Sequence, residues 1–338
     1  MIIVFRPDAT DKDIDAVVDQ LKSIGMTPHL SRGESRTICG AIGDERKLVE
    51  HPLDAFSGIE RIIPILKPYK LASREFQKED TIIDVGGVKI GGATFTVMAG
   101  PCAVENKDQV FYLADYLVKQ GIHVMRGGAF KPRSSPYALQ GMGVEGLKIL
   151  AAARERTGLK IITEVLDVDD CEAVAEYADI LQIGARNMQN FSLLKRCGKY
   201  RKPVCLKRGM SATIQETLLA AEYILKEGNH DVMLCERGIK TFETYTRNTL
   251  DISAVPALKL ESHLPVIVDP SHSAGMKELI PALSRAGVAV GADGIIVEVH
   301  HQPEKALCDG NQALRPQDFE VVMREVKRVA AAMDRVVQ

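Results

Sequence analysis

The sequence lacks three features: a stripe of basic residues, a long apolar run and a Cys-x-x-Cys pair. Lys and Arg are scattered among Asp and Glu, and the formal net charge of the 338 residues is −2, which makes nucleic acid a poor candidate for a partner. The apolar run at the start of the chain stops at Arg6 and Pro7, and it is too short for a signal peptide or a membrane span. We therefore expect a cytoplasmic protein with neither a nucleic-acid nor a membrane partner.

The cysteines do not have the pattern of a disulfide scaffold. There are seven, an odd number, and several lie within apolar runs such as "PVCLK" and "VMLCE", where a thiol behaves as a small hydrophobe. Such usage is typical of a reducing compartment, in line with the expected location. The cysteines are Cys39, Cys102, Cys171, Cys197, Cys205, Cys235 and Cys308.

The start of the chain has the order of elements that is typical of a ferredoxin-like α+β domain. "IIVF" predicts a strand, and the helical spacing of Ile14, Val17 and Leu21 predicts the helix that follows it. Two short strands, a short helix and a closing strand complete the order β-α-β-β-α-β. We expect this domain over residues 1–66, followed by a polar linker over residues 67–80.

The rest of the chain alternates apolar runs with helical stretches. A hairpin that turns at Gly86 and Gly87 comes first. Eight strands that are expected to be buried follow over about 250 residues, which predicts a parallel sheet closed into a (β/α)8 barrel over residues 81–338. An open doubly wound sheet is the alternative, although no G-x-G-x-x-G turn follows the first strand. The eight runs are "FTVMAGP", "HVMRGG", "KIITEV", "ILQIGA", "PVCLKRG", "VMLCERG", "PVIVDPSH" and "GIIVEVH".

Charged residues follow nearly every one of these strands, at the end of a barrel where catalytic groups lie. Five of them are cations, which repel one another in one cavity unless an anion binds among them. Arg suits bidentate binding of a carboxylate or phosphate, and Lys adds a point charge, so the pattern predicts a phosphorylated substrate. Pairing of each cation with a nearby carboxylate is the alternative. The five cations are Arg126, Lys131, Arg186, Lys207 and Arg237.

A second group of residues near the strand ends has mixed sulfur, nitrogen and oxygen donors. These residues follow the first, seventh and eighth strands, which become neighbours when the barrel closes. Such a donor set suits a borderline divalent ion of the Mn, Fe, Co or Zn class. A lone cysteine is more often a buried thiol and a lone histidine a hydrogen-bonded loop residue, so the prediction depends on their meeting in space. The four residues are Cys102, His272, Glu298 and Asp309.

Six segments match motifs of a known family, in the expected order from about residue 70 to the end: "AGPCAVE", "RGGAFKPRSSPYALQG", "IGARNMQN", "LKRGM", "DPSHSAG" and "GIIVEVH". On these motifs the chain resembles 3-deoxy-D-arabino-heptulosonate 7-phosphate (DAHP) synthase, in the subgroup related to octulosonate 8-phosphate synthase. The resemblance implies a metal-dependent transferase of the shikimate pathway. Its reaction condenses phosphoenolpyruvate with erythrose 4-phosphate and releases phosphate.

The resemblance also implies a role for each charged group at the strand ends. The four mixed donors match the metal ligands, and the five cations match the phosphoenolpyruvate site, with Glu164 beside it. Arg186, Arg237 and the amide of Ala185 are expected to face the phosphate. The other cations are expected nearer the carboxylate and the bridging oxygen, and Lys131 is the candidate proton donor to the new alkoxide. Loss of a cysteine or histidine metal ligand is expected to abolish activity.

The loop "KPRSS" is expected to bind the second substrate. Arg133, Ser134 and Ser135 match the site for the phosphate of erythrose 4-phosphate. In octulosonate 8-phosphate synthase, which takes the longer arabinose 5-phosphate, one more residue separates the lysine from the arginine of this loop. Only Pro132 separates Lys131 from Arg133 here, which favours the shorter sugar and leaves the octulosonate enzyme as the alternative.

Two other classes of function fit part of the pattern. A phosphate-binding barrel without catalysis would explain the cations, but simple anion capture needs no set of metal ligands. A Schiff-base aldolase with Lys207 as its nucleophile would need a desolvated pocket that is poor in charge, whereas Arg208 is its neighbour in the sequence. Both classes therefore rank behind the synthase.

The N-terminal domain resembles the regulatory modules of some members of this family, which sense the aromatic products of the pathway. The resemblance implies feedback inhibition by tyrosine or phenylalanine, and assembly as a homotetramer. His29 and Ser31 flank Leu30 and are expected on one face of a strand, where they would bind the head group of an amino acid. Ordinary solvated polar residues on a strand are the alternative.

Overall fold

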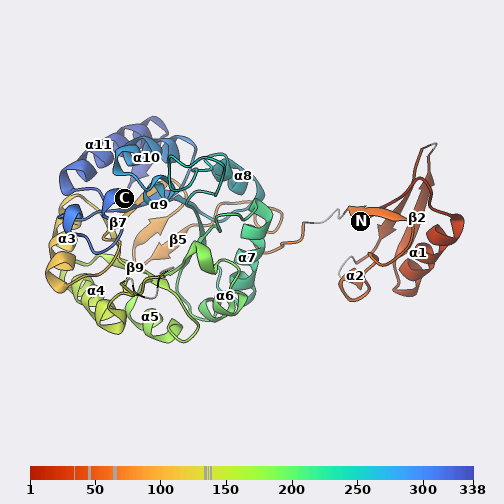
Figure 1. Cartoon of the computed structure of the whole chain (residues 1–338), viewed down its shortest axis with the longest axis horizontal. Coiled ribbons are helices and arrows are strands. Elements are labelled where there is room, and N and C mark those ends of the chain that lie inside the picture. Colours follow the sequence, from red (N-terminus) through yellow and green to blue (C-terminus); the bar gives the residue numbers. More distant parts are fainter. Residues whose placement is uncertain (34, 45–46, 64–66, 133–134, 136, 138) are drawn as a thin grey trace. The chain divides into compact units, whose positions relative to one another are not determined.

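A computed structural model describes residues 1–338 apart from 34, 45–46, 64–66, 133–134, 136 and 138. The chain divides into two compact units, Met1–Pro68 and Tyr69–Gln338, and each has a hydrophobic core of its own (Figure 1). None of the helices in these described ranges is long and apolar enough to cross a membrane.

The N-terminal unit has a four-stranded antiparallel sheet in the order β2-β3-β1-β4, which is the predicted ferredoxin-like arrangement. Thr10 and Asp13 cap the first helix reciprocally: the Thr10 N–H donates to the Asp13 carboxylate over 2.9 Å, and the Asp13 N–H donates to the Thr10 hydroxyl over 3.3 Å. Ile14, Val17 and Leu21 of this helix are buried against the sheet, as their spacing predicted. The elements are β1 (Ile2–Phe5), α1 (Asp11–Ser23), β2 (Thr27–Arg32), β3 (Thr37–Ile42), α2 (Lys47–Glu50) and β4 (Ile59–Ile63).

Eight parallel strands in the described part of the second unit form a closed ring. Each pairs with the next along the chain, and the last pairs with the first from Gly294↔Thr96 to Glu298↔Gly100. This closure confirms the predicted barrel and excludes the open sheet. The strands are β7 (Thr94–Gly100), β8 (Val124–Arg126), β9 (Lys160–Val165), β10 (Ile180–Ile183), β11 (Val204–Lys207), β12 (Val232–Glu236), β13 (Val266–Val268) and β14 (Gly294–Glu298).

Helices alternate with these strands and surround the ring (Figure 1). Their apolar side chains pack on the strands in one continuous core, because a parallel sheet is buried on both faces. A short strand, β15 (Val336–Val337), follows the last helix and pairs with β7, which was not predicted. The main helices are α3 (Lys107–Lys119), α4 (Gly143–Thr157), α5 (Cys171–Tyr177), α6 (Phe191–Gly198), α7 (Ile214–Lys226), α8 (Ala254–Glu261), α10 (Ile280–Ala289) and α11 (Pro316–Ala332). Shorter turns are α9 (Pro270–Ala274), η1 (Ala185–Asn187), η2 (Lys277–Leu279), η3 (Pro303–Lys305) and η4 (Gly310–Gln312).

The predicted hairpin closes the amino end of the barrel. Its strands β5 (Ile83–Val85) and β6 (Val88–Ile90) pair in antiparallel register, and β5 lies within the ring of barrel strands in Figure 1. Ile83 and Ile90 are fully buried among side chains near the starts of the barrel strands, such as Val124 and Ile180. The hairpin therefore acts as an apolar plug.

The segment between the hairpin and the N-terminal unit is attached to the barrel from Tyr69 onward. Tyr69 and Ala72 are buried in the barrel core. The backbone N–H groups of Leu71 and Ala72 each donate to the Glu222 carboxylate over 2.9 Å. The sequence predicted a polar linker over residues 67–80, because its few apolar side chains have no helical or strand period; single buried contacts of this kind leave no periodic signal.

Candidate active site at the carboxyl end of the barrel

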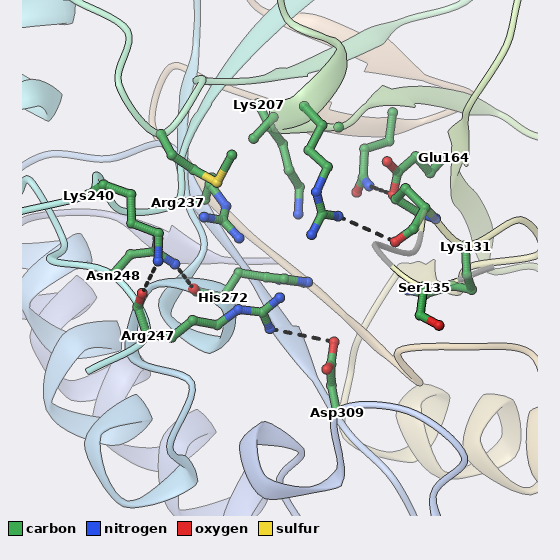
Figure 2. A pocket seen from close by; sticks show the side chains of 16 residues that line it. Lys131, Ser135, Glu164, Lys207, Arg237, Lys240, Arg247, Asn248, His272 and Asp309 are labelled. Carbon is green, nitrogen blue, oxygen red and sulfur yellow. Dashed lines mark hydrogen bonds and ion pairs between the residues drawn. The ribbon is translucent and has the colours of Figure 1, made fainter. Parts of the chain in front are cut away.

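The carboxyl ends of the barrel strands surround a cavity of about 440 Å³ (Figure 2). Lys207 is the last residue of β11, and Arg237 directly follows β12, so the strand ends themselves deliver these cations to the cavity. Four of the five predicted cations are among the lining residues. The predicted site residues that line the cavity are Lys131, Ser135, Glu164, Ala185, Arg186, Lys207, Arg237, His272 and Asp309.

Arg237 gives the strongest sign that an anion binds here. The residue is 6% exposed, and its Nη1 is buried without a hydrogen-bond partner in the described ranges. Burial lowers the pKa of this guanidinium, and the nearby cations Arg247 and Arg186 lower it further, against the attraction of Asp269. Because an arginine stays charged in proteins, the unmet donor and the crowded positive charge favour a bound anion.

Lys207 and Asp269 form a buried ion pair at the same end of the barrel, with 2.6 Å between Nζ and Oδ2. Burial opposes the charge of both groups. The attraction of Asp269 nevertheless raises the pKa of Lys207, and His272 together with Lys207 holds the pKa of Asp269 well below its usual range. Lys207 is therefore an ammonium group that presents a fixed positive charge.

Glu164 enters the cavity through space that a glycine leaves free. The Nε2 of Gln182 donates to Oε2 of Glu164 over 3.2 Å and fixes its carboxylate. A Cβ on Gly184 would lie 2.0 Å from Oε1 of Glu164, so a larger residue at this position would displace the carboxylate. The glycine is thus required by the close approach of a predicted site residue.

The turn η1 directly follows β10 and Gly184, and it brings the two neighbouring predicted phosphate ligands to the cavity. Ala185 and Arg186 are its first two residues, and both line the cavity. The Nη1 of Arg186 donates to the carbonyl oxygen of Pro132 over 3.3 Å. This contact connects the strand-end turn to the loop that is predicted to bind the second substrate.

Lys131 links the cavity to the predicted metal ligands. Its Nζ donates to the carbonyl oxygen of Cys102 over 3.0 Å and lies 3.2 Å from Sγ of the same residue. Ser135 is exposed and lines the cavity. The predicted ligands Arg133 and Ser134 lie outside the described residues.

Arg126 faces the predicted metal ligands. Its Nη1 donates to the carbonyl oxygen of Pro101 over 2.6 Å and lies 3.1 Å from Oε1 of Glu298. Arg126 is not among the described residues that line the cavity. Pairing with a carboxylate, the alternative for each cation, therefore occurs for Arg126 and for Lys207, whereas Nη1 of Arg237 has no partner among the described residues.

The four predicted metal ligands meet at the mouth of the barrel. Asp309 belongs to two groups of donor atoms, one with His272 and Glu298 and the other with Cys102 and Cys308, and the atoms of each group lie within 4.8 Å of one another. Sγ of Cys102 is 3.5 Å from Oδ2 of Asp309 and 3.0 Å from Sγ of Cys308. The four residues thus lie close together in space, which is the condition on which the predicted metal site depends.

The protonation of His272 also suits a metal ion. Burial lowers the pKa of this imidazole, which favours its neutral form. Its Nδ1 lies 2.8 Å from Oδ2 of Asp269, although no aligned hydrogen bond joins it to a described residue. Its Nε2 is 3.4 Å from Oε1 of Glu298. A neutral imidazole nitrogen and a carboxylate oxygen at this separation can both bind one cation, so the donor set fits a divalent metal.

Several residues of the site were not predicted. The sequence could have indicated Cys308, because it directly precedes the predicted ligand Asp309. It could also have indicated Asp269, because this residue directly follows a strand. The sequence did not indicate the residues of the loop after β12, since they lie beyond the strand end and reach the cavity only through the path of the folded loop. The unpredicted lining residues that carry polar side chains are Gln182, Lys240, Arg247 and Asn248.

In the N-terminal unit, His29 and Ser31 lie on β2 and are both exposed. Leu30 between them packs against the core of the unit, so the two polar side chains share the opposite face, as the alternation predicted. They pair with Gly40 and Ile38 of β3. Their role in binding an effector stays a prediction.

The closed barrel and its cation-lined mouth are typical of an enzyme that acts on small anionic substrates, and the mouth also holds residues that could bind a metal ion. Residues 75–335 match the model of the DAHP synthetase I family, and residues 1–67 match the model of the DAHP synthase ferredoxin-like domain. The chain belongs to the DAHP synthetase I family.

Relatives of known name agree with this family. The chain is 53% identical to the phospho-2-dehydro-3-deoxyheptonate aldolase of Thermotoga maritima over 98% of each chain. A crystal structure of that DAHP synthase superposes with a TM-score of 0.97 at 52% identity, covering 100% of this chain and 99% of that one. The 2-dehydro-3-deoxyphosphooctonate aldolase of Citrifermentans bemidjiense is more distant, with 32% identity over 75% of this chain and 98% of its own. The chain is thus more similar to the heptulosonate enzyme, as its motifs predicted.

Proposed function

We propose that the mouth of the barrel condenses phosphoenolpyruvate with erythrose 4-phosphate to DAHP and phosphate, the first step of the shikimate pathway. Both substrates carry a phosphate, and one carries a carboxylate as well, which accounts for the number of cations around one cavity. The observation that carries the assignment is the buried guanidinium of Arg237, whose Nη1 has no partner in the described ranges. Family membership supplies the reaction.

Phosphoenolpyruvate binds among the cations that line the cavity. Arg186, Arg237 and the amide N–H of Ala185 take its phosphate, since planar guanidinium groups pair with phosphate oxygens through two bonds at once. Lys131 and Lys207 lie toward the carboxylate and the bridging oxygen. The pair of Lys207 with Asp269 supports this role, because it keeps the amine protonated before substrate arrives.

Arg126 and Glu164 support the same substrate from its surroundings. Arg126 pairs with Glu298 over 3.1 Å, and it contributes positive charge near the substrate carboxylate although it is not among the described residues that line the cavity. Glu164 lies beside the phosphoenolpyruvate site, where its carboxylate is fixed by Gln182. Erythrose 4-phosphate binds at the adjacent loop through Arg133, Ser134 and Ser135, of which Ser135 lines the cavity.

Cys102, His272, Glu298 and Asp309 would hold the divalent metal, with Cys308 next to Cys102. A bound divalent metal supplies Lewis-acid polarisation of the erythrose 4-phosphate aldehyde. The neutral imidazole and the mixed donor set support an ion of the Mn, Fe, Co or Zn class.

The chain's own residues then account for the protonation of the new alkoxide and for the departure of phosphate. C3 of phosphoenolpyruvate attacks the aldehyde carbon, and Lys131 donates the proton that the new alkoxide takes up. Positive charge at C2 is met by water, which loses a proton and gives a phosphohemiketal. That species collapses with cleavage of its C–O bond to phosphate, and Arg186 and Arg237 stabilise the charge on the departing phosphate.

The direct test is phosphate release from phosphoenolpyruvate plus erythrose 4-phosphate, with and without EDTA. Release should require both substrates and should stop on chelation. Substitution of arabinose 5-phosphate for erythrose 4-phosphate should give much slower release. Turnover by a metal-free Cys102→Ala protein at the normal rate would contradict the role of the metal.

A Schiff-base mechanism at Lys207 is disfavoured by its ion pair. A nucleophilic lysine needs a lowered pKa, whereas burial is outweighed here by Asp269 and the pKa of Lys207 is raised. Borohydride treatment in the presence of phosphoenolpyruvate should therefore leave the protein unmodified. A mass increase on Lys207 would overturn this conclusion.

The N-terminal unit is proposed to bind tyrosine or phenylalanine and to lower turnover, with His29 and Ser31 as ligands of the amino-acid head group. Their exposure on one face of β2 supports this role. Inhibition curves for each aromatic amino acid, on the wild type and on His29→Ala, test it; a chain insensitive to all three would contradict it. The homotetramer that the family resemblance implies is tested by light scattering after size-exclusion chromatography.

A further inference from the structure

A chain of hydrogen bonds runs from the cavity to the predicted metal ligands. Nη1 of Arg247 donates to Oε1 of Gln312 over 2.9 Å, and Nε2 of Gln312 donates to Oε2 of Glu298 over 2.8 Å. The same Nη1 lies 3.5 Å from Oδ2 of Asp309, a contact that is visible in Figure 2. From this geometry we propose that Arg247 and Gln312 are positioning residues, which orient the carboxylates of Glu298 and Asp309 for the metal.

The network fixes the orientation of the Gln312 amide. A guanidinium can only donate, so the amide oxygen must face Arg247, and the amide nitrogen is then left to face Glu298. Gln312 is 2% exposed, so water offers little competition for either amide atom. One oxygen of Glu298 is thereby occupied. The other, Oε1, accepts from Arg126 over 3.1 Å and lies 3.4 Å from Nε2 of His272, on the side of the proposed metal.

The loop that carries Arg247 also contacts the segment of a third ligand. Nδ2 of Asn248 donates to the carbonyl oxygen of His272 over 2.9 Å, and the backbone N–H of Arg247 donates to the carbonyl oxygen of Ala274 over 3.0 Å. Two successive residues after β12 thus contact α9, which carries His272, and Asp309 of the loop after β14. Outer contacts that orient metal ligands commonly change metal affinity by about 10–100-fold.

Two effects of Arg247 on a bound cation oppose each other. Its positive charge repels the ion, whereas its hydrogen bond to Gln312 holds the carboxylate that binds the ion. Gln312→Met removes the donor to Glu298 without changing any charge, so it isolates the positioning effect. Arg247→Met removes the donor and the charge together. The proposal rests on the metal site proposed above, so the metal site itself has to be titrated first.

The experiment is a titration of the metal-free, full-length chain with Co²⁺ alone, followed through the cobalt–thiolate charge-transfer absorbance. The wild type should show a saturable band that Cys102→Ser removes; a wild type without this band would overturn the proposed metal site and leave no ligands to position. Given the band, Gln312→Met should raise the Kd for Co²⁺ by about 10–100-fold, and Arg247→Met by a smaller factor. The double variant should bind more weakly than Gln312→Met only by the contribution of the direct contact between Arg247 and Asp309, because the rest of the effect of Arg247 passes through Gln312.

Arg315→Met is the matched control. Its guanidinium lies 3.1 Å from Glu304, and the variant should leave the Kd for Co²⁺ unchanged. Arg247 has a side chain that is 36% exposed, so Arg247→Met is expected to fold. A raised Kd for Co²⁺ in this variant supports the positioning role even where Gln312→Met fails to fold, because loss of the positive charge alone would lower the Kd. A Kd within twofold of the wild type in folded Gln312→Met, or a lower Kd in Arg247→Met, would overturn the proposal. A raised KM for erythrose 4-phosphate with an unchanged Kd for Co²⁺ would make Arg247 a substrate ligand instead.

Discussion

The two ends of the barrel are built from the same strands but differ in polarity. At the amino end, the hairpin buries Ile83 and Ile90 among apolar side chains near the strand starts. At the carboxyl end, strands finish on ionisable groups such as Arg126, Lys207 and Glu298, which are just as deeply buried. The change from an apolar plug to an ionic mouth takes place along the length of single short strands.

This difference separates stability from chemistry within one sheet. Burial of apolar side chains stabilises the fold by about 25 cal/mol per Å² removed from water, so the plug contributes to folding. Buried charges cost free energy unless they are paired. The mouth pairs some of them, such as Lys207 with Asp269, while Nη1 of Arg237 has no partner in the part of the chain that the structure describes. The buried charges of the mouth are therefore expected to support activity at a cost in stability. The plug is expected to support stability without a direct role in activity.

The largest effect should come from removal of a proposed metal ligand at the mouth. His272→Ala removes the neutral imidazole whose Nε2 faces Glu298, and we expect turnover below detection because the ion is lost. Metal content by mass spectrometry after dialysis, beside the rate of phosphate release, is the measurement. A variant that keeps its metal and its rate would contradict the assignment of this end of the barrel to chemistry.

The next largest effect should come from Arg237, whose Nη1 has no partner among the described residues. Arg237→Met is expected to lower kcat/KM for phosphoenolpyruvate by about 10²–10³-fold, as for other donors that stabilise developing charge. The midpoint of thermal unfolding should stay the same or rise, because a buried and incompletely paired cation is removed. Steady-state kinetics tests the expected loss of kcat/KM, and calorimetry tests the expected midpoint of thermal unfolding. A midpoint below that of the wild type would mean that the charge of Arg237 stabilises the fold.

A third effect depends on pH and concerns the buried ion pair of the mouth. The pKa of Asp269 lies well below its usual range despite burial, because the adjacent His272 and Lys207 favour its ionised form. A folded pKa below the unfolded value, about 3.9, means stability that is fully present above that value and is lost as pH falls through the folded pKa.

Asp269→Asn should therefore be destabilised by about 3–5 kcal/mol at pH 7, the usual cost of breaking a buried pair. The difference from the wild type should persist down to about pH 4 and shrink only below it. Urea unfolding at pH 7, 5 and 3 measures this difference, with Asp84→Asn on the exposed face of β5 as the control. A difference that already vanishes at pH 5 would contradict the lowered pKa.

Much of the fold could be predicted from the sequence because its elements have strong periods. The apolar runs that became β7 to β14 are separated by helical stretches, and this alternation predicts a barrel by itself. The parts of the fold that could not be predicted have no periodic pattern of apolar residues. β15 has two residues, and the burial of Tyr69 and Ala72 depends on single contacts of a polar segment with the barrel surface.

The residues of the candidate site also divide into those that could be predicted from the sequence and those that could not. Residues at strand ends, such as Lys207 and Glu298, could be predicted because barrel closure gathers every strand end at one mouth. The partner of each group could not, since pairings such as Lys207 with Asp269 depend on side-chain directions across the ring. Gln312 gave no signal at all, because it reaches Glu298 only through the turn η4 in the loop after β14.

The smallest effect on catalysis should come from the opposite end of the barrel. Ile90→Ala removes a fully buried side chain from the plug, and a change of this kind costs about 2–5 kcal/mol of the free energy of unfolding, through lost burial and the cavity that remains. Well below the unfolding transition, kcat and both KM values should match the wild type, because the strand ends at the mouth are unchanged.

Lys89→Ala is the matched control, since Lys89 is exposed on the same strand of the hairpin and its removal should leave the unfolding midpoint nearly unchanged. Denaturant unfolding and steady-state kinetics on the same preparations provide the comparison. If Ile90→Ala lowers kcat while the protein is fully folded, then a change in the packing of the plug alters the groups at the mouth through the strands. The separation of stability from chemistry would then fail, because one rigid sheet would transmit a cavity at its amino end to the groups at its carboxyl end.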